Sequence, residues 1–207
     1  DKPEELFKNM RFDVIIGNPP YQLSTGGELS QATPLYNKFV LQAIKLNPRY
    51  LIMIIPARWY SGGMGLSDFR NKMLNDKRIS EIHDFPETSD CFPGLNIRGG
   101  VCYFLWDRVH DGNCKITTHN SKTTGETVER PLLEEGNDIF IRYNEAISIL
   151  KKVRSKNEES FSNIVSSQKP FGIPTNFSNF ENQKSNNNSI TLYRFGEKGY
   201  VNKNQVV

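Results

Sequence analysis

The sequence predicts an α/β fold in which the strands of a parallel sheet alternate with helices. Three short runs, centred on residues 12–16, 50–55 and 101–106, are mainly apolar and lack the polar alternation of a half-exposed strand. Segments with apolar residues at helical spacing lie between them. The 207 residues, of which 37% are hydrophobic, suffice for one good-sized domain or for one domain and part of another.

The first strand and the first helix follow from local signals. Residues 12–16 centre on Val14-Ile15-Ile16, are bounded by Gly and Pro, and are predicted to form a buried strand. Pro34 fits the first turn of a helix, with Thr33 as a possible cap, and Asn47-Pro48 ends that helix. Its apolar face would consist of Leu35, Phe39, Val40, Ala43 and Ile44.

The next elements repeat this order. Residues 50–55, "YLIMII", end at Pro56 and predict a second strand. A short helix is expected from Leu66 to Leu74, and its inward residues would be Phe69, Met73 and Leu74. "RISEIHDF" is predicted as a third strand and "VCYFLW" as a fourth.

The character of the chain changes after Asp107. "KITTHN" is a possible strand, and residues 143–153 form a plausible helix whose inward residues would be Ala146, Ile147, Leu150 and Val153. Residues 176–189 are rich in Asn and Ser and are predicted to be a loop. The basic stretch 142–170 allows a phosphate-facing surface, but a solvated helix face is the favoured interpretation.

Composition excludes several classes of protein. A net charge of +3 permits nucleic-acid binding without demanding it. The three cysteines and three histidines show no metal-ligand spacing, so no metal is predicted and the cysteines are expected to be reduced thiols. No stretch approaches the roughly 20 apolar residues of a membrane span, and "DKPEELFKNM" is not a signal peptide. We therefore expect a cytoplasmic protein without a membrane partner and, because the initiator Met is missing, a piece of a longer chain.

The stretch "IIGNPPY" places Asn18-Pro19-Pro20-Tyr21 directly after the first strand. Proline fixes φ and pushes the preceding residue to an extended conformation, so two prolines hold the chain rigid after Asn18. The Asn18 side-chain oxygen and the Pro19 carbonyl then form two fixed acceptors for a substrate NH₂ group. Tyr21 supplies a flat face for stacking, a contact worth about 1–3 kcal/mol per base.

Two acceptors also suit the chemistry of an amine on an aromatic ring, whose lone pair is delocalised into the ring. When both N–H bonds point at acceptors, the nitrogen moves toward tetrahedral geometry and its lone pair becomes available. The same oxygens stabilise the positive charge that develops during attack. The stretch therefore predicts a site that grips an amino group.

"IIGNPPYQ" resembles the catalytic motif of the N6-adenine-specific DNA methyltransferases of type II restriction–modification systems. The resemblance implies a Rossmann-like methyltransferase sheet, S-adenosylmethionine as methyl donor, and double-stranded DNA whose target adenine is rotated out of the helix. It also implies that Asn18 and Pro19 hold the amine, that Pro20 shapes the turn and that Tyr21 stacks on the base.

A second stretch, "CFPGLNIRGGVCYFLWDR", is similar to the hairpin that precedes the last strand of the family's sheet. The resemblance implies that Phe92 packs on the other side of the flipped base, although a core phenylalanine in a loop is the competing interpretation. "PLYNKFVLQAI" also looks like the helix that follows the family's catalytic strand. The likeness covers about residues 10–108.

The resemblance divides the chain into three parts. Residues 1–115 would be the C-terminal half of the methyltransferase domain, residues 116–160 a connecting region with a helix, and residues 161–207 the start of a DNA target-recognition region in a mixed α+β part.

The family's glycine-rich cofactor turn and its ribose-binding acid do not occur in this sequence, so the cofactor-binding residues are unknown. Gly62-Gly63-Met64-Gly65 follows the wrong strand and is interpreted as a flexible loop near the rim of the active site. Without the family's first strand, the apolar edge at residues 12–16 would be unpaired. We expect a second copy or another segment to cover it, and expect the fragment alone to be inactive.

Three alternatives remain open at the level of sequence. A glutamine side chain also presents a planar NH₂, so a protein glutamine methyltransferase is possible, although the roughly hundred residues after the fourth strand favour a nucleic-acid reader. RNA adenine methylation uses the same chemistry. A DNA-binding fragment without activity of its own is the non-enzyme alternative.

Overall fold

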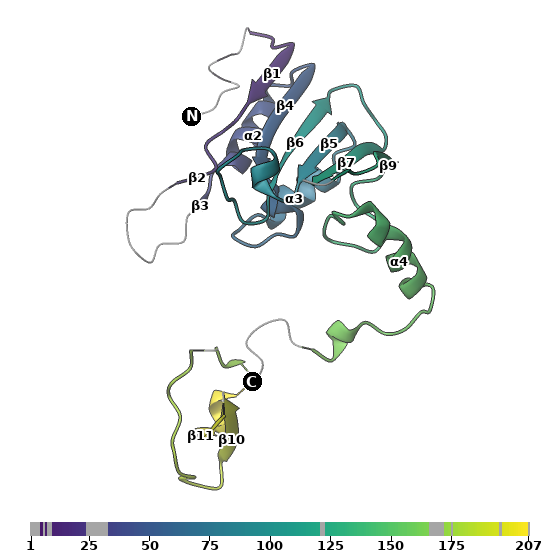
Figure 1. Cartoon of the computed structure of the whole chain (residues 1–207). Coiled ribbons are helices and arrows are strands. Elements are labelled where there is room, and N and C mark those ends of the chain that lie inside the picture. The colour runs from purple at the N-terminus through teal and green to yellow at the C-terminus, as the bar shows by residue number, and fades with distance from the viewer. Residues whose placement is uncertain are drawn as a thin grey trace. The chain divides into compact units, whose positions relative to one another are not determined.

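The computed structural model describes residues 5, 7, 10–23, 33–120, 123–165, 172–174, 176–194 and 196–206 (Figure 1). The chain forms two compact units, Asp1–Lys151 and Lys152–Val207. The first contains the predicted sheet and the Asn18-Pro19-Pro20-Tyr21 motif.

The sheet of the first unit has the strand order β1-β4-β6-β5-β7-β8, and β9 pairs with β7 as well. Strands β1, β4, β5 and β7 run in one direction, because β1 is parallel to β4, β5 is parallel to β7, and β4 and β5 are both antiparallel to β6. The strands are β1 Val14–Gly17, β4 Tyr50–Pro56, β5 Ile79–Phe85, β6 Val101–Asp107, β7 Cys114–Asn120, β8 Thr123–Thr124 and β9 Val128–Arg130.

The prediction of an α/β fold is confirmed, because parallel-paired strands and helices form one sheet-centred unit. The prediction that all strands are parallel is wrong, because β6 lies between β4 and β5 and opposes both. A strand buried on both faces is apolar whichever way it runs, so the sequence pattern is blind to direction. The sheet also continues beyond the fourth predicted strand into β7.

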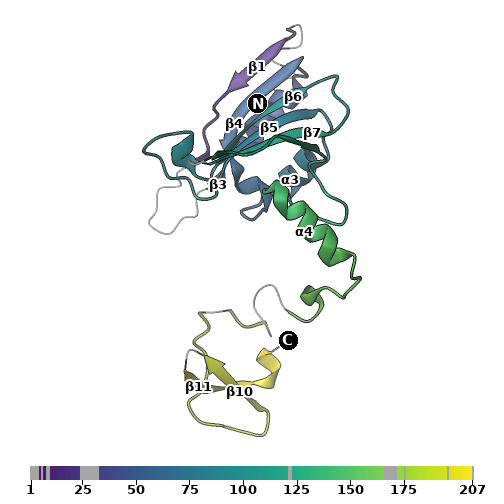
Figure 2. The same cartoon turned by 45° about the vertical axis from the view of Figure 1, so that its right-hand side comes forward.

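Two helices cover one face of this sheet, α2 (Tyr36–Lys45) and α3 (Ser67–Leu74) (Figures 1 and 2). The predicted buried face of α3, Phe69, Met73 and Leu74, is confirmed, and that of α2 is confirmed in part, at Val40 and Ala43. They pack in one core with Leu51, Ile55, Phe104 and Trp106 of the strands and with Trp59 of the short 3-10 helix η1 (Ala57–Tyr60).

The predicted start of the first helix is wrong. Helix α2 begins at Tyr36 with Leu35 at its N-cap and without a side-chain cap. Thr33 and Pro34 form the short strand β3 (Thr33–Pro34), which pairs antiparallel with β2 (Gln22–Leu23). Pro34 sits at the edge of a two-stranded pair, a position where its missing N–H is tolerated. Phe39, a predicted inward residue, is 44% exposed.

Strand β1 is not buried, which corrects the expectation for residues 12–16. Val14 is 49% and Ile16 74% exposed. The physical reason is position: among the described strands, β1 pairs with β4 alone and lies at the end of the strand order.

The predicted helix near residue 143 is present as α4 (Asn144–Arg154). Ala146, Ile147 and Leu150 are half-buried, but Val153 is 62% exposed, so its predicted inward position is wrong. Arg142 does not face solvent as part of a basic surface. It forms an ion pair with the buried Asp84, with Nε 2.7 Å from Oδ2.

Contacts divide the chain between Lys151 and Lys152, while the sequence placed functional boundaries after residues 115 and 160. The boundary at 115 cuts β7. The assignment of these parts to methylation and target recognition therefore stays a prediction.

The second unit contains an antiparallel hairpin, β10 (Ser189–Arg194) and β11 (Glu197–Asn202). The described residues of this unit also include the 3-10 helices η3 (Phe161–Asn163) and η5 (Lys203–Gln205), and the Asn202 side chain caps η5. Within the described part of the chain, no helix is long and apolar enough to cross a bilayer.

Candidate active site

Asn18-Pro19-Pro20-Tyr21 lies directly after β1, at the edge of the sheet where β1, β4, β5 and β7 end. Ligands of open α/β sheets bind at this edge. Pro19 is buried, and the backbone N–H of Leu35 donates to the Tyr21 carbonyl oxygen at 3.0 Å. The motif is therefore fixed at both ends, by β1 before it and by the start of α2 after it.

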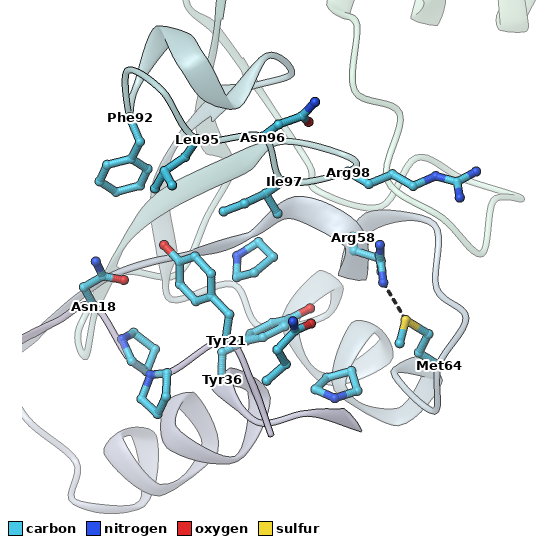
Figure 3. A pocket seen from close by; sticks show the side chains of 15 residues that line it. Asn18, Tyr21, Tyr36, Arg58, Met64, Phe92, Leu95, Asn96, Ile97 and Arg98 are labelled. Atoms are coloured by element: carbon cyan, nitrogen blue, oxygen red, sulfur yellow. Dashed lines mark hydrogen bonds between the residues drawn. The ribbon is translucent and has the colours of Figure 1, made fainter. Parts of the chain in front are cut away.

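The four motif residues line a cavity of about 570 Å³, large enough for a nucleotide-sized ligand. Phe92, from the loop between β5 and β6, lines the same cavity. Figure 3 shows the rings of Tyr21 and Phe92 on the side of Asn18. The remaining lining residues are Gln22, Pro34, Tyr36, Pro56, Arg58, Met64, Leu95, Asn96, Ile97 and Arg98.

The structure thus brings together all five predicted site residues, although 71 positions separate Tyr21 from Phe92 (92 − 21). Asn18 is exposed and forms no hydrogen bond with another described residue. Its amide group is available to a ligand.

Tyr21 is half-buried and packs against the core. The pKa of Tyr21 is raised to about 12, mainly by burial and to a smaller extent by the nearby Cys91 and Cys102 thiols. Tyr36 behaves alike: burial is the main cause of its raised pKa, and Arg58 opposes the shift. Both phenols are therefore neutral at physiological pH and do not serve as bases.

Phe92 is positioned by the short 3-10 helix η2 (Thr88–Asp90). The Phe92 N–H donates to the Thr88 carbonyl at 2.7 Å, and the buried Thr88 hydroxyl donates to the Ile97 carbonyl at 3.0 Å. In return, the Ile97 N–H donates to the Thr88 hydroxyl at 3.2 Å. One threonine thus ties together the two ends of the loop that carries Phe92.

Sequence analysis missed five polar residues of this cavity, Gln22, Tyr36, Arg58, Asn96 and Arg98. Arg58 had a signal, because it follows Pro56 at the carboxyl end of a predicted strand, the same kind of position as Asn18. No local sequence pattern marked Arg98 or Tyr36, since only the folded chain brings them close to the motif.

The glycine cluster lies where it was expected, beside the site. Met64 lines the cavity, and its sulfur accepts a hydrogen bond from Arg58 Nη1 at 2.6 Å. Gly62, with φ of +83°, lies against Arg70, whose guanidinium occupies the space that a Cβ would take. Cys91, Cys102 and Cys114 are free thiols. Among the described residues, no group of three or more His, Cys, Asp or Glu side chains is suited to a metal ion.

Residues 1–92 match the Eco57I restriction-modification methylase family. These 92 of the 207 residues are similar to that family. The match includes the motif, β4, both helices, β5 and Phe92, so the resemblance inferred from the sequence is confirmed.

Two curated relatives support the same assignment. An uncharacterized adenine-specific methylase of Mycoplasma pneumoniae is 45% identical over 129 residues, which cover 59% of this chain and 31% of that protein. Type II methyltransferase M.PstI of Providencia stuartii is 25% identical over 186 residues, which cover 84% of this chain and 35% of M.PstI. The chain thus spans about a third of the length of these relatives.

Solved structures with partial similarity include two methyltransferase or modification subunits of type I restriction systems. The methyltransferase subunit from Streptococcus thermophilus aligns with a TM-score of 0.41 at 12% identity, over 74% of this chain and 34% of that one. The modification subunit of a putative type I restriction enzyme from Vibrio vulnificus gives 0.40 at 14% identity, over 74% and 33%.

Proposed function

We propose that this segment holds the target base in an enzyme that methylates the N6 amine of adenine in DNA. The observation that carries the proposal is the cavity in which Asn18-Pro19-Pro20-Tyr21 and Phe92 meet at the carboxyl edge of the sheet. Two relatives that match the chain are named adenine-specific methylase and type II methyltransferase.

The amine would be held by two acceptors. The Asn18 side-chain oxygen and the Pro19 carbonyl each accept one N–H of the target NH₂ group, which makes its lone pair available for attack on a methyl carbon. Positive charge that develops on the nitrogen is stabilised by both oxygens. No base is needed before transfer, since the proton becomes acidic as the new N–C bond forms, and the two neutral tyrosines of the cavity fit this requirement.

Two aromatic rings favour a flat heterocycle over a glutamine side chain as the target. Tyr21 and Phe92 line the cavity together, and base–aromatic stacking contributes about 1–3 kcal/mol per base. A glutamine has no ring to occupy the space between them. This arrangement is the reason to rank adenine above glutamine.

The proposed methyl donor is S-adenosylmethionine, which supplies the methyl group when bound. The described residues do not fit as its binding site: their glycine cluster follows β4, and Gly62 of that cluster is closed off by Arg70. We therefore propose that the described residues hold the target amine and do not form the main binding site of the methyl donor.

The proposal extends to the rest of the chain and to the setting of the enzyme. Residues 161–207 would begin the region that reads the DNA sequence, and a flipped adenine would be the group that enters the cavity. The enzyme would work in the cytoplasm, and a second copy or another segment would cover the exposed edge of β1.

The test is methyl transfer from labelled S-adenosylmethionine to unmethylated genomic DNA by the complete natural protein, followed by digestion to nucleosides. We expect label in N6-methyladenine and a loss of about 100-fold or more in Asn18→Ala, the size typical of removing one preorganised stabilising group. Asn71→Ala is the matched control, because Asn71 is exposed on α3 and should leave the rate unchanged.

Label in RNA, or in glutamine of a protein extract, would move the assignment to the corresponding alternative. Equal activity of the Asn18→Ala and Asn71→Ala variants would refute the role of Asn18.

A further inference from the structure

The end of the cavity away from Asn18 is positively charged. Of its 15 lining residues, only Arg58 and Arg98 carry a full charge, and no acidic residue is among them. In Figure 3 both arginines lie on the side opposite Asn18 and Phe92. An amine-binding end and an arginine end therefore share one cavity.

Both arginines extend from well-fixed backbone. Pro56 pairs with Val101 across β4 and β6, and the Ala57 N–H donates to the Gly100 carbonyl at 3.0 Å. A Cβ on Gly99 would lie only 3.9 Å from the Arg58 Cα, so the two chain segments are close neighbours. The residue before Arg98, Ile97, is held by the two hydrogen bonds to Thr88 described above.

Neither charge is compensated by a residue that the structure describes. Arg58 donates to the neutral Met64 sulfur, a weak acceptor, and neither Arg58 nor Arg98 forms an ion pair with another described residue. Arg142 shows the contrast, because both Asp84 carboxylate oxygens lie within 3.0 Å of its guanidinium nitrogens. A pair of arginines without an acidic partner is suited to an external anion, and the planar guanidinium matches a phosphate in particular.

The arginines also line a second cavity beside the first. Arg58, Met64 and Arg98 belong to both, and the second continues past Tyr60, Gly62 and Phe140. A chain-like anion that leaves the first cavity for the second would pass these two guanidinium groups, whereas a single small anion would need only one of the cavities.

We propose that Arg58 and Arg98 form a phosphate subsite that holds a phosphodiester of the nucleic-acid strand beside the target nucleotide. The proposal rests on the proposed function and deepens it, because it specifies a polyanionic strand as the substrate. A protein glutamine has no such group to place there.

The experiment measures the KM for unmethylated genomic DNA at 50 and 200 mM salt with the complete natural protein and its Arg58→Gln, Arg98→Gln and double variants. Each lost phosphate contact lowers the slope of log affinity against log salt by about 0.9. From 50 to 200 mM salt the KM rises by some factor for each protein. The factor for the wild type should therefore be about three to four times the factor for a variant that lacks one arginine. Arg58→Lys and Arg98→Lys keep the charge and should restore the wild-type slope.

Arg108→Gln is the matched control, since Arg108 is exposed and donates to the Asn47 carbonyl at the other end of the sheet. Thermal unfolding shows whether each variant is folded. Slopes for Arg58→Gln and Arg98→Gln equal to that of Arg108→Gln would overturn the subsite while leaving adenine methylation intact.

A second measurement keeps the subsite testable if the DNA is not methylated at all. Fluorescence anisotropy of labelled DNA and RNA oligonucleotides then gives the salt slope of binding directly. A slope reduced by both Gln variants supports the subsite for whichever nucleic acid binds. Unchanged slopes, or methylation of a glutamine peptide that is indifferent to both arginines, would rule it out.

Discussion

Strands β1 and β6 belong to the same sheet and have similar apolar sequences, but only β6 is buried. In β6, Cys102, Phe104 and Trp106 have no exposed surface, whereas in β1 Val14 is 49% and Ile16 74% exposed. The difference comes from position, because β6 lies between β4 and β5 while β1 has β4 as its one described neighbour. Burial in this sheet is thus decided by strand order and not by composition.

The two strands also differ in what they contribute, one to the proposed function and the other to stability. The motif that we propose to hold the amine follows the exposed strand, while the buried strand supplies core residues. Four substitutions test this division, beginning with the largest expected effect.

Phe104→Ala in β6 should lower the free energy of unfolding by about 3–5 kcal/mol, because it removes a fully buried aromatic ring and leaves a cavity. Urea unfolding measures the change. A loss below about 1 kcal/mol would mean that β6 is not at the centre of the core.

Gly100→Ala, just before β6, should cost about 2 kcal/mol or more. Gly100 has φ of +78°, which alone costs an alanine about 1–2 kcal/mol, and a Cβ would lie 2.1 Å from the Phe85 carbonyl oxygen. Gly94→Ala is the control, since Gly94 has a similar φ of +83° but nothing within 4 Å of its Cβ position. The two variants should differ in thermal unfolding, and equal losses would show that the contact with Phe85 is relieved without cost.

Acidification should weaken the His83–His119 pair on β5 and β7. His83 Nδ1 and His119 Nε2 are 2.9 Å apart, a hydrogen bond in which one ring donates and the other accepts. Burial lowers the pKa of both, and for His83 the neighbouring His119 lowers it further while Glu81 opposes the shift.

A lowered histidine pKa favours the neutral form in the folded state. The stability contribution of the pair is therefore present above the usual histidine pKa of about 6.5 and is lost as the pH falls through the lowered values. Asp84 acts in the opposite sense, because burial raises its pKa to about 6 against the influence of Arg142, so its contribution to stability falls as the pH rises toward 6.

The measurement compares the melting temperatures of wild type and His119→Gln from pH 8 to 5, since the Asp84 contribution cancels in the difference. The wild type should lose more stability than the variant below pH 6.5. His110→Gln, at a half-buried histidine that contacts the Asn113 carbonyl and lies outside the His83–His119 pair, should follow the wild type. Parallel curves for His119→Gln and wild type would contradict the assignment.

Ile16→Ala in β1 should have the smallest effect, within about 0.5 kcal/mol, as expected of an exposed side chain. A cost comparable to that of Phe104→Ala would mean that the edge is covered in solution. Light scattering would then decide whether a second copy covers it. If the protein is a monomer and Ile16→Ala still costs as much as Phe104→Ala, another segment covers the edge.

Local signals predicted most of the elements correctly. The helix from Leu66 to Leu74 and the strands at residues 50–55 and 101–106 appear within one or two residues of their predicted positions. Errors occurred where tertiary contacts decide: Thr33 and Pro34 pair with β2 instead of starting a helix, and Val153 is exposed although it fits an apolar helix face.

The candidate site divides in the same way. Asn18, Pro19, Pro20 and Tyr21 were visible in the sequence because their chemistry is contained in four consecutive residues and in the fixed φ of proline. Phe92 was placed by resemblance, and the cavity that it shares with Tyr21 is a property of the folded chain.

Hydrophobic periodicity, turn residues and one four-residue motif were therefore enough to predict most of the elements, the α/β class and the loop that we propose to bind the amine, because each acts over a few neighbouring positions. Strand direction and order, the exposure of β1 and the meeting of Arg58 with Arg98 were decided only in the tertiary structure. These features depend on contacts between residues that are tens of positions apart, and no local pattern encodes which of those contacts form.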